Sequence, residues 1–369
     1  MLRILVSHSP CIFTAKTENT MKNISFNLWS KGLALLFVCV IALAGCSKVG
    51  NKTVSTREEL LAAMNDSDNT ESMIYVMSDT VCSTNPELLM LLDTLYQHVR
   101  SENFPTNTKD ELKWMSAYRS RLCAYYDSYE KDGDNLTEFE KANYVLDEGV
   151  RLVELDGDDS TMGIIVRNST VYTFDVLRRY GLLSQLLSYC HNVKTQELIY
   201  KEWELYDELS CEMMSLFSDI IVLNYWSGSI VGPLRTGCWI DISESRNDMY
   251  QKVLNIVEKD LWNEKGVSLD YAQQLLTDCS IKAVEDIVSE MKSDTIESPY
   301  LNEKEAIRYN ETIKSAEESI QELRPLLQKW GILWKKIDKE ISHDNDEHKI
   351  EFAASSMLIE WAKIASAGW

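Results

Sequence analysis

The sequence is poor in the two residues that most often interrupt helices. Its 369 residues include only 14 glycines and 6 prolines. Alternating runs of Val, Ile and Thr, which would indicate strands, are also few. Long stretches rich in Leu, Glu and Lys lie between the sparse breakers, and this distribution favours helices. We therefore expect an all-α protein made of one or more helical bundles.

Motifs that commonly carry catalysis are absent. The chain has 5 histidines, and it lacks a His-Glu-x-x-His motif, a Gly-x-Ser-x-Gly motif and a glycine-rich phosphate loop. His343 and His348 lie among acidic residues, but their spacing does not place both imidazoles on one helical face. We expect no enzymatic activity, no metal site and no cofactor.

Basic residues are scarce relative to acidic ones. The chain has 37 Lys and Arg against 58 Asp and Glu, a formal net charge of -21. Such a charge argues against nucleic acid and anionic lipid headgroups as partners. It favours a basic protein or a cation, although solubility through self-repulsion is the simpler explanation. The 45% hydrophobic content is enough for a sizeable core.

The apolar run near the N-terminus is typical of a lipoprotein signal peptide. Lys22 and Lys31 precede the apolar segment 32–43, which leads into Leu-Ala-Gly-Cys46. A basic flank, a short apolar core and small residues before the cleavage site define such a signal. The segment is shorter than the roughly 20 residues that span a bilayer as a helix. We expect lipid on Cys46 after cleavage, and a transmembrane anchor is the alternative.

This signal sets the expected organisation of the chain. Residues 1–20 do not fit a signal peptide, whereas Met21 opens a conventional one, so we expect translation to start at Met21 and the signal peptide to end at residue 45. Residues 46–56 are polar and predict a flexible tether. Neither an acidic run nor an aspartate follows Cys46, which indicates an anchor in the outer membrane facing the periplasm. Three helical regions are expected to follow, over 57–192, 193–265 and 266–369.

Capping and apolar periodicity predict the individual helices. Thr137-Glu-Phe-Glu140 has the spacing of a capping box. Pro325 lies within the longest amphipathic stretch and is expected to kink or break it. A short helix is expected to start near Thr56, and the others are predicted at about 85–101, 109–129, 137–154, 170–189, 195–224, 244–262, 267–292, 302–341 and 347–366.

Cysteines are the next constraint on the mature chain. An even number of them in an oxidising periplasm indicates disulfides, in one of many possible pairings. A free buried thiol is the alternative for any single cysteine. The residues concerned are Cys82, Cys123, Cys190, Cys211, Cys238 and Cys279.

The most specific pattern lies within 193–265. Trp203 and Tyr206 precede Cys211, the segment Gly228-Ser229-Ile230 follows, and Cys238, Ser243 and Arg246 come after it. Over roughly 65 residues this resembles the LprI-type lysozyme-inhibitor family, whose members are small helical domains of bacterial envelope proteins. In the resemblance Trp203 and Tyr206 match the aromatic positions, Gly228–Ile230 the linking loop, and Ser243 and Arg246 the following helix. Asp207 departs from the family, which usually has arginine there.

The resemblance also implies disulfides. Cys211 and Cys238 match the family's cysteine pair, which would staple one helix to a second helix capped by Ser243. A similar arrangement upstream, with Trp114, Tyr118 and Cys123, suggests a second copy, and Cys123 would then pair with Cys190.

The function that the resemblance implies is protein binding. A member of this family would be held at the membrane by its N-terminal lipid and would inhibit a lysozyme, which as a basic protein suits so acidic a chain. The alternative is a structural or assembly lipoprotein of the envelope, in which the same motif is only scaffold.

Overall fold

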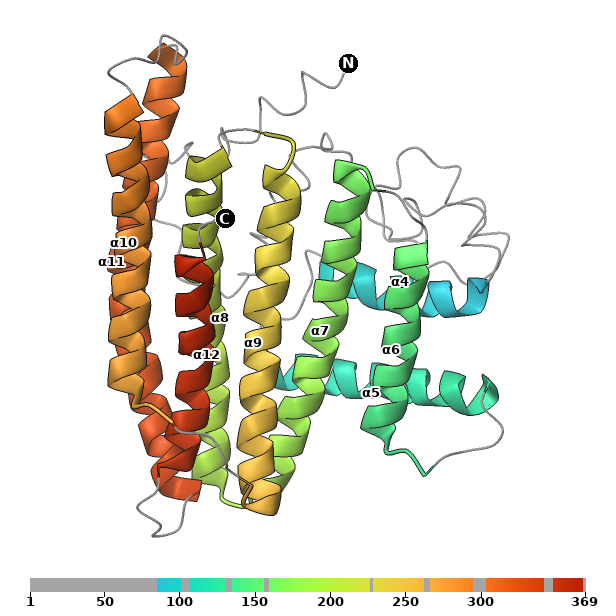
Figure 1. The fold of residues 1–369 in the computed structure, drawn as a ribbon. Helices are drawn as coiled ribbons and strands as arrows, with labels where there is room; N and C mark the ends of the chain where they lie inside the picture. The colour runs from blue at the N-terminus through green and yellow to red at the C-terminus, as the bar shows by residue number, and fades with distance from the viewer. Residues whose placement is uncertain are drawn as a thin grey trace. The chain divides into compact units, whose positions relative to one another are not determined.

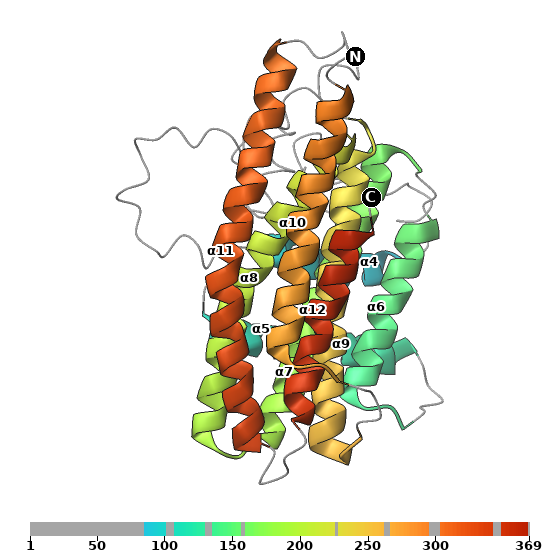
Figure 2. The ribbon, with the colours of Figure 1, turned by 60° about the vertical axis from the view of Figure 1, so that its left-hand side comes forward.

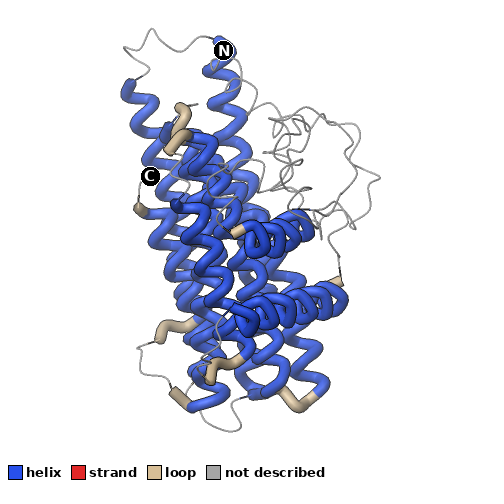
Figure 3. The backbone as a smooth tube through the Cα atoms, turned by 90° about the vertical axis from the view of Figure 1, so that its right-hand side faces the viewer, coloured by secondary structure: helices blue, strands red, loops and turns tan. Residues whose placement is uncertain are grey.

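The described part of the chain is entirely helical. A computed structural model describes residues 85–100, 107–129, 135–155, 159–225, 228–261, 266–294, 303–341 and 348–367. Every regular element in these ranges is an α-helix, and no strand occurs among them (Figure 3). The predicted all-α class is thus confirmed. The predicted signal peptide, the lipidation site Cys46, the tether, the helix near Thr56 and Cys82 lie outside the described residues.

The chain divides into two compact units, with the boundary inside one helix (Figure 1). The N-terminal unit contains α4 (Pro86–Arg100), α5 (Thr108–Tyr129), α6 (Glu138–Leu155) and the part of α7 (Thr161–Tyr189) that ends at Gly181. The C-terminal unit begins at Leu182 and contains α8 (Val193–Tyr225), α9 (Val231–Lys259), α10 (Leu269–Asp294), α11 (Glu303–Ile341) and α12 (Lys349–Ser366). Among the described residues, no helix is both long enough and apolar enough to cross a membrane.

In the N-terminal unit, local capping and one glycine explain how α6 is placed. The capping box predicted before α6 is present, because Thr137 N–H donates to Glu140 Oε2 (2.8 Å) and Glu140 N–H donates to Thr137 Oγ1 (3.3 Å). Gly149 lies where a Cβ would come within 2.4 Å of Leu92 Cδ1 and 3.0 Å of Phe174 Cε2. The absence of a side chain there lets α6 approach both α4 and α7.

The C-terminal unit is a ring of antiparallel helices with one exception. Its helices contact one another in the order α8, α9, α12, α10, α11 and back to α8 (Figures 1 and 2). Leu269 N–H at the start of α10 donates to Glu351 Oε1 in the first turn of α12 (3.2 Å), so these two helices begin side by side and run parallel. A closed ring built from an odd number of helices requires one such pair.

Helix α9 begins a dozen residues earlier than the sequence suggested. Ser243 was expected to be its N-cap, but it lies in the middle of the helix and is fully buried. Gly232 and Pro233 resemble loop residues, although proline is tolerated in a first turn, where its missing N–H has no helical partner. Core-facing Trp239 and Ile242 stabilise the early turns by burial.

The predicted disulfides are not formed. Cys123, Cys190, Cys211, Cys238 and Cys279 are all free thiols in the structure. Glu202 on α8 contacts α9, and Cys211 follows it by nine residues, or about 2.5 turns. Cys211 therefore lies on the opposite side of α8. No disulfide joins it to Cys238 on α9. The Sγ of Cys123 instead donates a hydrogen bond to Glu138 O (3.2 Å). This thiol thus links α5 to α6 and forms no bond to Cys190.

Candidate functional site

A fully buried carboxylate joins three helices of the C-terminal unit. Glu202 on α8 forms a bidentate ion pair with Arg246 on α9, with Nη1 to Oε1 at 2.5 Å and Nη2 to Oε2 at 2.7 Å. Tyr250 OH, one turn further along α9, donates to Oε2 (2.9 Å). From α11, Trp330 Nε1 and Trp334 Nε1 donate to Oε1 at 2.6 and 3.0 Å. We call these five side chains the Glu202 network.

Aromatic rings surround the Arg246 guanidinium within this network. Its Cζ lies 3.9 Å from the ring centroid of Tyr206, 4.3 Å from that of Tyr250 and 5.8 Å from that of Trp203. Burial by itself lowers the pKa of Arg246, but the negative charge of Glu202 outweighs burial and raises it above its ordinary value. Burial raises the pKa of Tyr250 well above its usual range. Arg246 is therefore protonated and Tyr250 neutral at any physiological pH.

The residues of the family-like motif take different positions. Trp203, Tyr206 and Arg246 come together in the core, whereas Gly228, Ser229 and Ile230 are exposed between α8 and α9. Sequence reasoning missed Glu202, Tyr250, Trp330 and Trp334. The one available signal was Trp330 on the apolar face of its helix, with Trp334 a turn later; nothing local pairs that face with Glu202.

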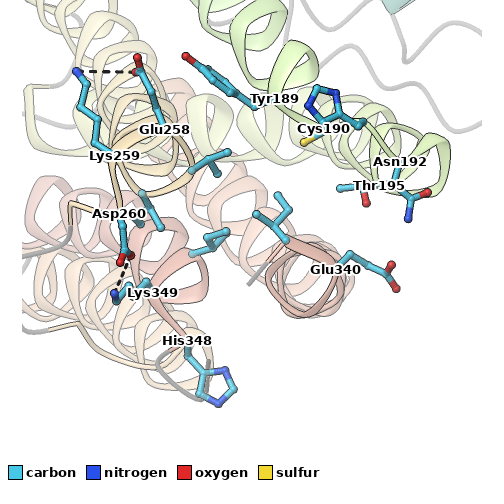
Figure 4. Close-up of a pocket in the computed structure, with 15 residues that line it drawn as sticks. Tyr189, Cys190, Asn192, Thr195, Glu258, Lys259, Asp260, Glu340, His348 and Lys349 are labelled. Carbon is cyan, nitrogen blue, oxygen red and sulfur yellow. Dashed lines mark hydrogen bonds and ion pairs between the residues drawn. The ribbon is translucent and has the colours of Figure 1, made fainter. Parts of the chain in front are cut away.

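A pocket of about 620 Å³ lies at one end of the same unit (Figure 4). It forms where α7, α9 and α11 end and where α8 and α12 begin. Two ion pairs lie in its wall, Lys349 with Asp260 at 2.9 Å and Lys259 with Glu258 at 3.8 Å. The polar side chains that line it are Tyr189, Cys190, His191, Asn192, Thr195, Glu258, Lys259, Asp260, Glu340, His348 and Lys349.

Large apolar side chains are exposed at this end. Tyr189 lines the pocket and is exposed, and Val193 and Leu261, each directly after a pocket residue, are exposed as well. Burial raises the pKa of the Cys190 thiol to about 11. Near neutral pH this thiol is protonated and poorly suited to act as a nucleophile. The pocket therefore has the composition of a binding surface, with apolar residues beside paired charges.

One group of potential metal ligands borders the pocket. His348, whose sequence neighbourhood suggested only a solvated turn, lies beside Asp338 near the end of α11 and Glu351 in the first turn of α12. The imidazole Nδ1 is 3.2 Å from Asp338 Oδ2 and 3.9 Å from Glu351 Oε2. Sequence reasoning paired His348 with His343, which lies outside the described residues, and missed both carboxylates.

Comparisons of the chain with protein-family models, with curated proteins and with solved structures found no match.

Proposed function

We propose that the mature chain is a lipoprotein of the bacterial envelope, anchored through Cys46 in the outer membrane and facing the periplasm, and that it acts by binding a basic protein. The observation that carries the proposal is the pocket end of the C-terminal unit. There, Tyr189, Val193 and Leu261 are exposed next to acidic side chains in a chain of net charge -21. An exposed aromatic within a polar rim is common in protein interfaces, and charge complementarity selects a basic partner.

A lysozyme is the specific partner that we propose, on the strength of the sequence resemblance. The motif residues that carry the resemblance, Trp203, Tyr206 and Arg246, are buried and cannot themselves touch a partner. They would support the fold, while the pocket end supplies the contacting surface. Inhibition would then depend on exposed residues at the pocket end and not on the three buried motif residues.

The proposal is tested by titrating the purified mature chain against a basic lysozyme. We expect saturable binding and loss of muramidase activity at low salt. Both should weaken at moderate salt, because ions screen the attraction between opposite charges. If neither binding nor inhibition occurs at either salt concentration, the proposal is wrong for the lysozyme tested.

A pair of tyrosine variants tests the location of the surface. Tyr189→Ala should weaken binding at least about fivefold, because tyrosines near the centre of an interface often carry much of its binding energy. Tyr129→Ala is the matched control, since Tyr129 is also exposed but lies at the end of α5 in the N-terminal unit. Equal affinities for the two variants would exclude Tyr189 from the interface.

A structural or assembly role in the envelope is the second candidate. It is favoured by the burial of Trp203, Tyr206 and Arg246, which makes this part of the motif belong to the core. A protein with this role should show no saturable binding to basic proteins. It should instead copurify with other envelope components after mild crosslinking in cells.

A further inference from the structure

Three side chains at the pocket end have the arrangement of a partial metal site. One potential ligand atom from each of Asp338, His348 and Glu351 lies within 4.8 Å of the other two. Two ligands of one Zn²⁺ at about 2.1 Å and a tetrahedral angle lie about 3.4 Å apart. The observed separations of 3.2 and 3.9 Å from His348 Nδ1 to the two carboxylate oxygens are close to this value.

The two carboxylates are fixed by hydrogen bonds through their other oxygens. Asp338 Oδ1 accepts the Ile350 N–H at 3.1 Å, and Glu351 Oε1 accepts the Leu269 N–H at 3.2 Å. Asp338 Oδ2 and Glu351 Oε2 are thereby directed toward His348. Hydrogen bonds to the non-coordinating atoms of ligands are the usual way in which proteins orient a metal site.

Glu351 faces His348 without a direct hydrogen bond between them. Its side chain is only 10% exposed, and its Oε2 lies 3.9 Å from His348 Nδ1, which is too far for a hydrogen bond. A cation between these two atoms would compensate the negative charge of the largely buried carboxylate. This spacing therefore suits an ion better than a direct contact.

Access and donor type indicate the class of ion. Asp338 is 5% exposed, whereas His348 is 61% exposed and lines the pocket, so the group is buried on one side and open on the other. One imidazole and two carboxylates suit Zn²⁺ and related transition ions, whereas Ca²⁺ and Mg²⁺ prefer sites made entirely of oxygen. Three protein ligands leave a coordination position open toward the pocket.

We propose that Asp338, His348 and Glu351 bind one divalent transition-metal ion of the zinc type. The ion lies between α11 and α12, and through Glu351 and Leu269 it is coupled to the start of α10. Because the three ligands converge only in the folded chain, binding stabilises the fold in proportion to the free metal concentration. The site borders the same pocket as Tyr189, but its three ligands are not among the exposed apolar residues of the proposed protein-binding surface.

The test uses the metal-free mature chain and ZnSO₄, with calorimetric titration and thermal unfolding. We expect one saturable site per chain and a rise in Tm with zinc. His348→Asn should weaken zinc binding at least about tenfold; asparagine tolerates the left-handed backbone of His348 (φ 45°). Asp338→Asn should have a similar effect while it keeps the oxygen that accepts the Ile350 N–H.

His191→Asn is the matched control, because His191 lines the same pocket but is not one of the three ligands. It should bind zinc as the unaltered chain does. Thermal unfolding without metal reports whether each variant is folded. Absence of saturable zinc binding to the unaltered chain would overturn the proposal. Equal binding by the unaltered chain and folded His348→Asn would overturn it as well, by assigning the zinc to other acidic residues.

Discussion

The Glu202 network places a charged pair where water cannot reach it. Neither Glu202 nor Arg246 is exposed, and the carboxylate receives donors from α9 and α11. Two buried ions are costly to desolvate, but removing one of them is costlier still, because the other then remains buried without compensation. The energetic importance of each partner is therefore best measured by removing it alone.

Replacing Glu202 with glutamine should destabilise the protein by about 3 to 5 kcal/mol. The side chain keeps its shape, but the Arg246 guanidinium loses its counter-charge, and the oxygen that becomes an amide nitrogen can no longer accept hydrogen bonds. Urea unfolding measures the change. Asp286→Asn, which breaks an exposed pair with Lys282, is the control and should have little effect. A loss no larger than that of the control would contradict a structural role for the network.

Asp219 on α8 should make stability dependent on pH. Burial raises its pKa from 3.8 to about 6. Between these values the folded chain holds a proton that the unfolded chain has released, so this group's contribution to stability falls as pH rises and is level above about pH 6. Asp219→Asn cannot lose a proton and should gain about 2 to 3 kcal/mol relative to the unaltered chain between pH 4 and pH 7.

Urea unfolding of both proteins at intervals across this range checks the prediction. The two stability curves should diverge as pH rises from 4 to 6 and run parallel beyond it. Curves that stay parallel throughout would indicate that Asp219 has an ordinary pKa in the folded protein.

Among the helices, α11 carries an unusual residue in its interior. Pro325 was expected to kink or break the helix, and the structure shows that it does not break it, because α11 runs as a single helix from Glu303 to Ile341. Pro325 is exposed, whereas Leu323, Leu327 and Trp330 are buried on the opposite face. Packing along that face maintains the helix despite the missing backbone donor.

Pro325→Ala should stabilise the protein by about 1 to 3 kcal/mol, because it restores a backbone N–H and removes the clash of the proline ring. Thermal unfolding measures the gain. Gly331→Ala on the same helix is the comparison; its new Cβ would lie 2.3 Å from Gln273 Nε2, so no gain is expected there. A lower Tm for Pro325→Ala would mean that packing requires the local geometry that proline imposes.

The helices show what the sequence could and could not predict. Helices α8, α10 and α12, among others, lie within a turn or so of their predicted bounds. Helix α7 starts at Thr161, earlier than predicted, and Ser160 Oγ accepts the Gly163 N–H at its start (3.1 Å). Weak helix formers such as Gly163 concealed these first turns of the helix.

The candidate sites were harder to predict than the helices. Trp203, Tyr206 and Arg246 were singled out and do lie together, but Glu202 and Trp330 are 128 residues apart in the chain. Similarly, Asp338 lies on α11, whereas His348 is the residue directly before α12. Apolar periodicity identifies the buried face of a helix but does not say which other helix packs against it. Local sequence therefore does not predict contacts between distant helices.

For the molecule as a whole, we expect stability that does not depend on disulfides. Alkylation in denaturant without a reductant, followed by mass spectrometry, should label Cys123, Cys190, Cys211, Cys238 and Cys279. A reductant should leave Tm unchanged. In the folded protein, burial raises the pKa of Cys211 and Cys238 and should keep both unreactive. If neither Cys211 nor Cys238 is alkylated in denaturant without a reductant, the two form the disulfide that the sequence suggested.

The ring of the C-terminal unit has a consequence for the order of folding during synthesis. Helix α12 lies between α9 and α10 and supplies Trp361, whose Nε1 donates to Ser245 Oγ on α9 (2.8 Å). Since α12 is translated after all of its neighbours, the ribosome releases α8 to α11 before the helix that closes the ring exists. The nascent chain must hold an open bundle with exposed apolar surface until then, a state in which chaperones or the secretion apparatus can engage it.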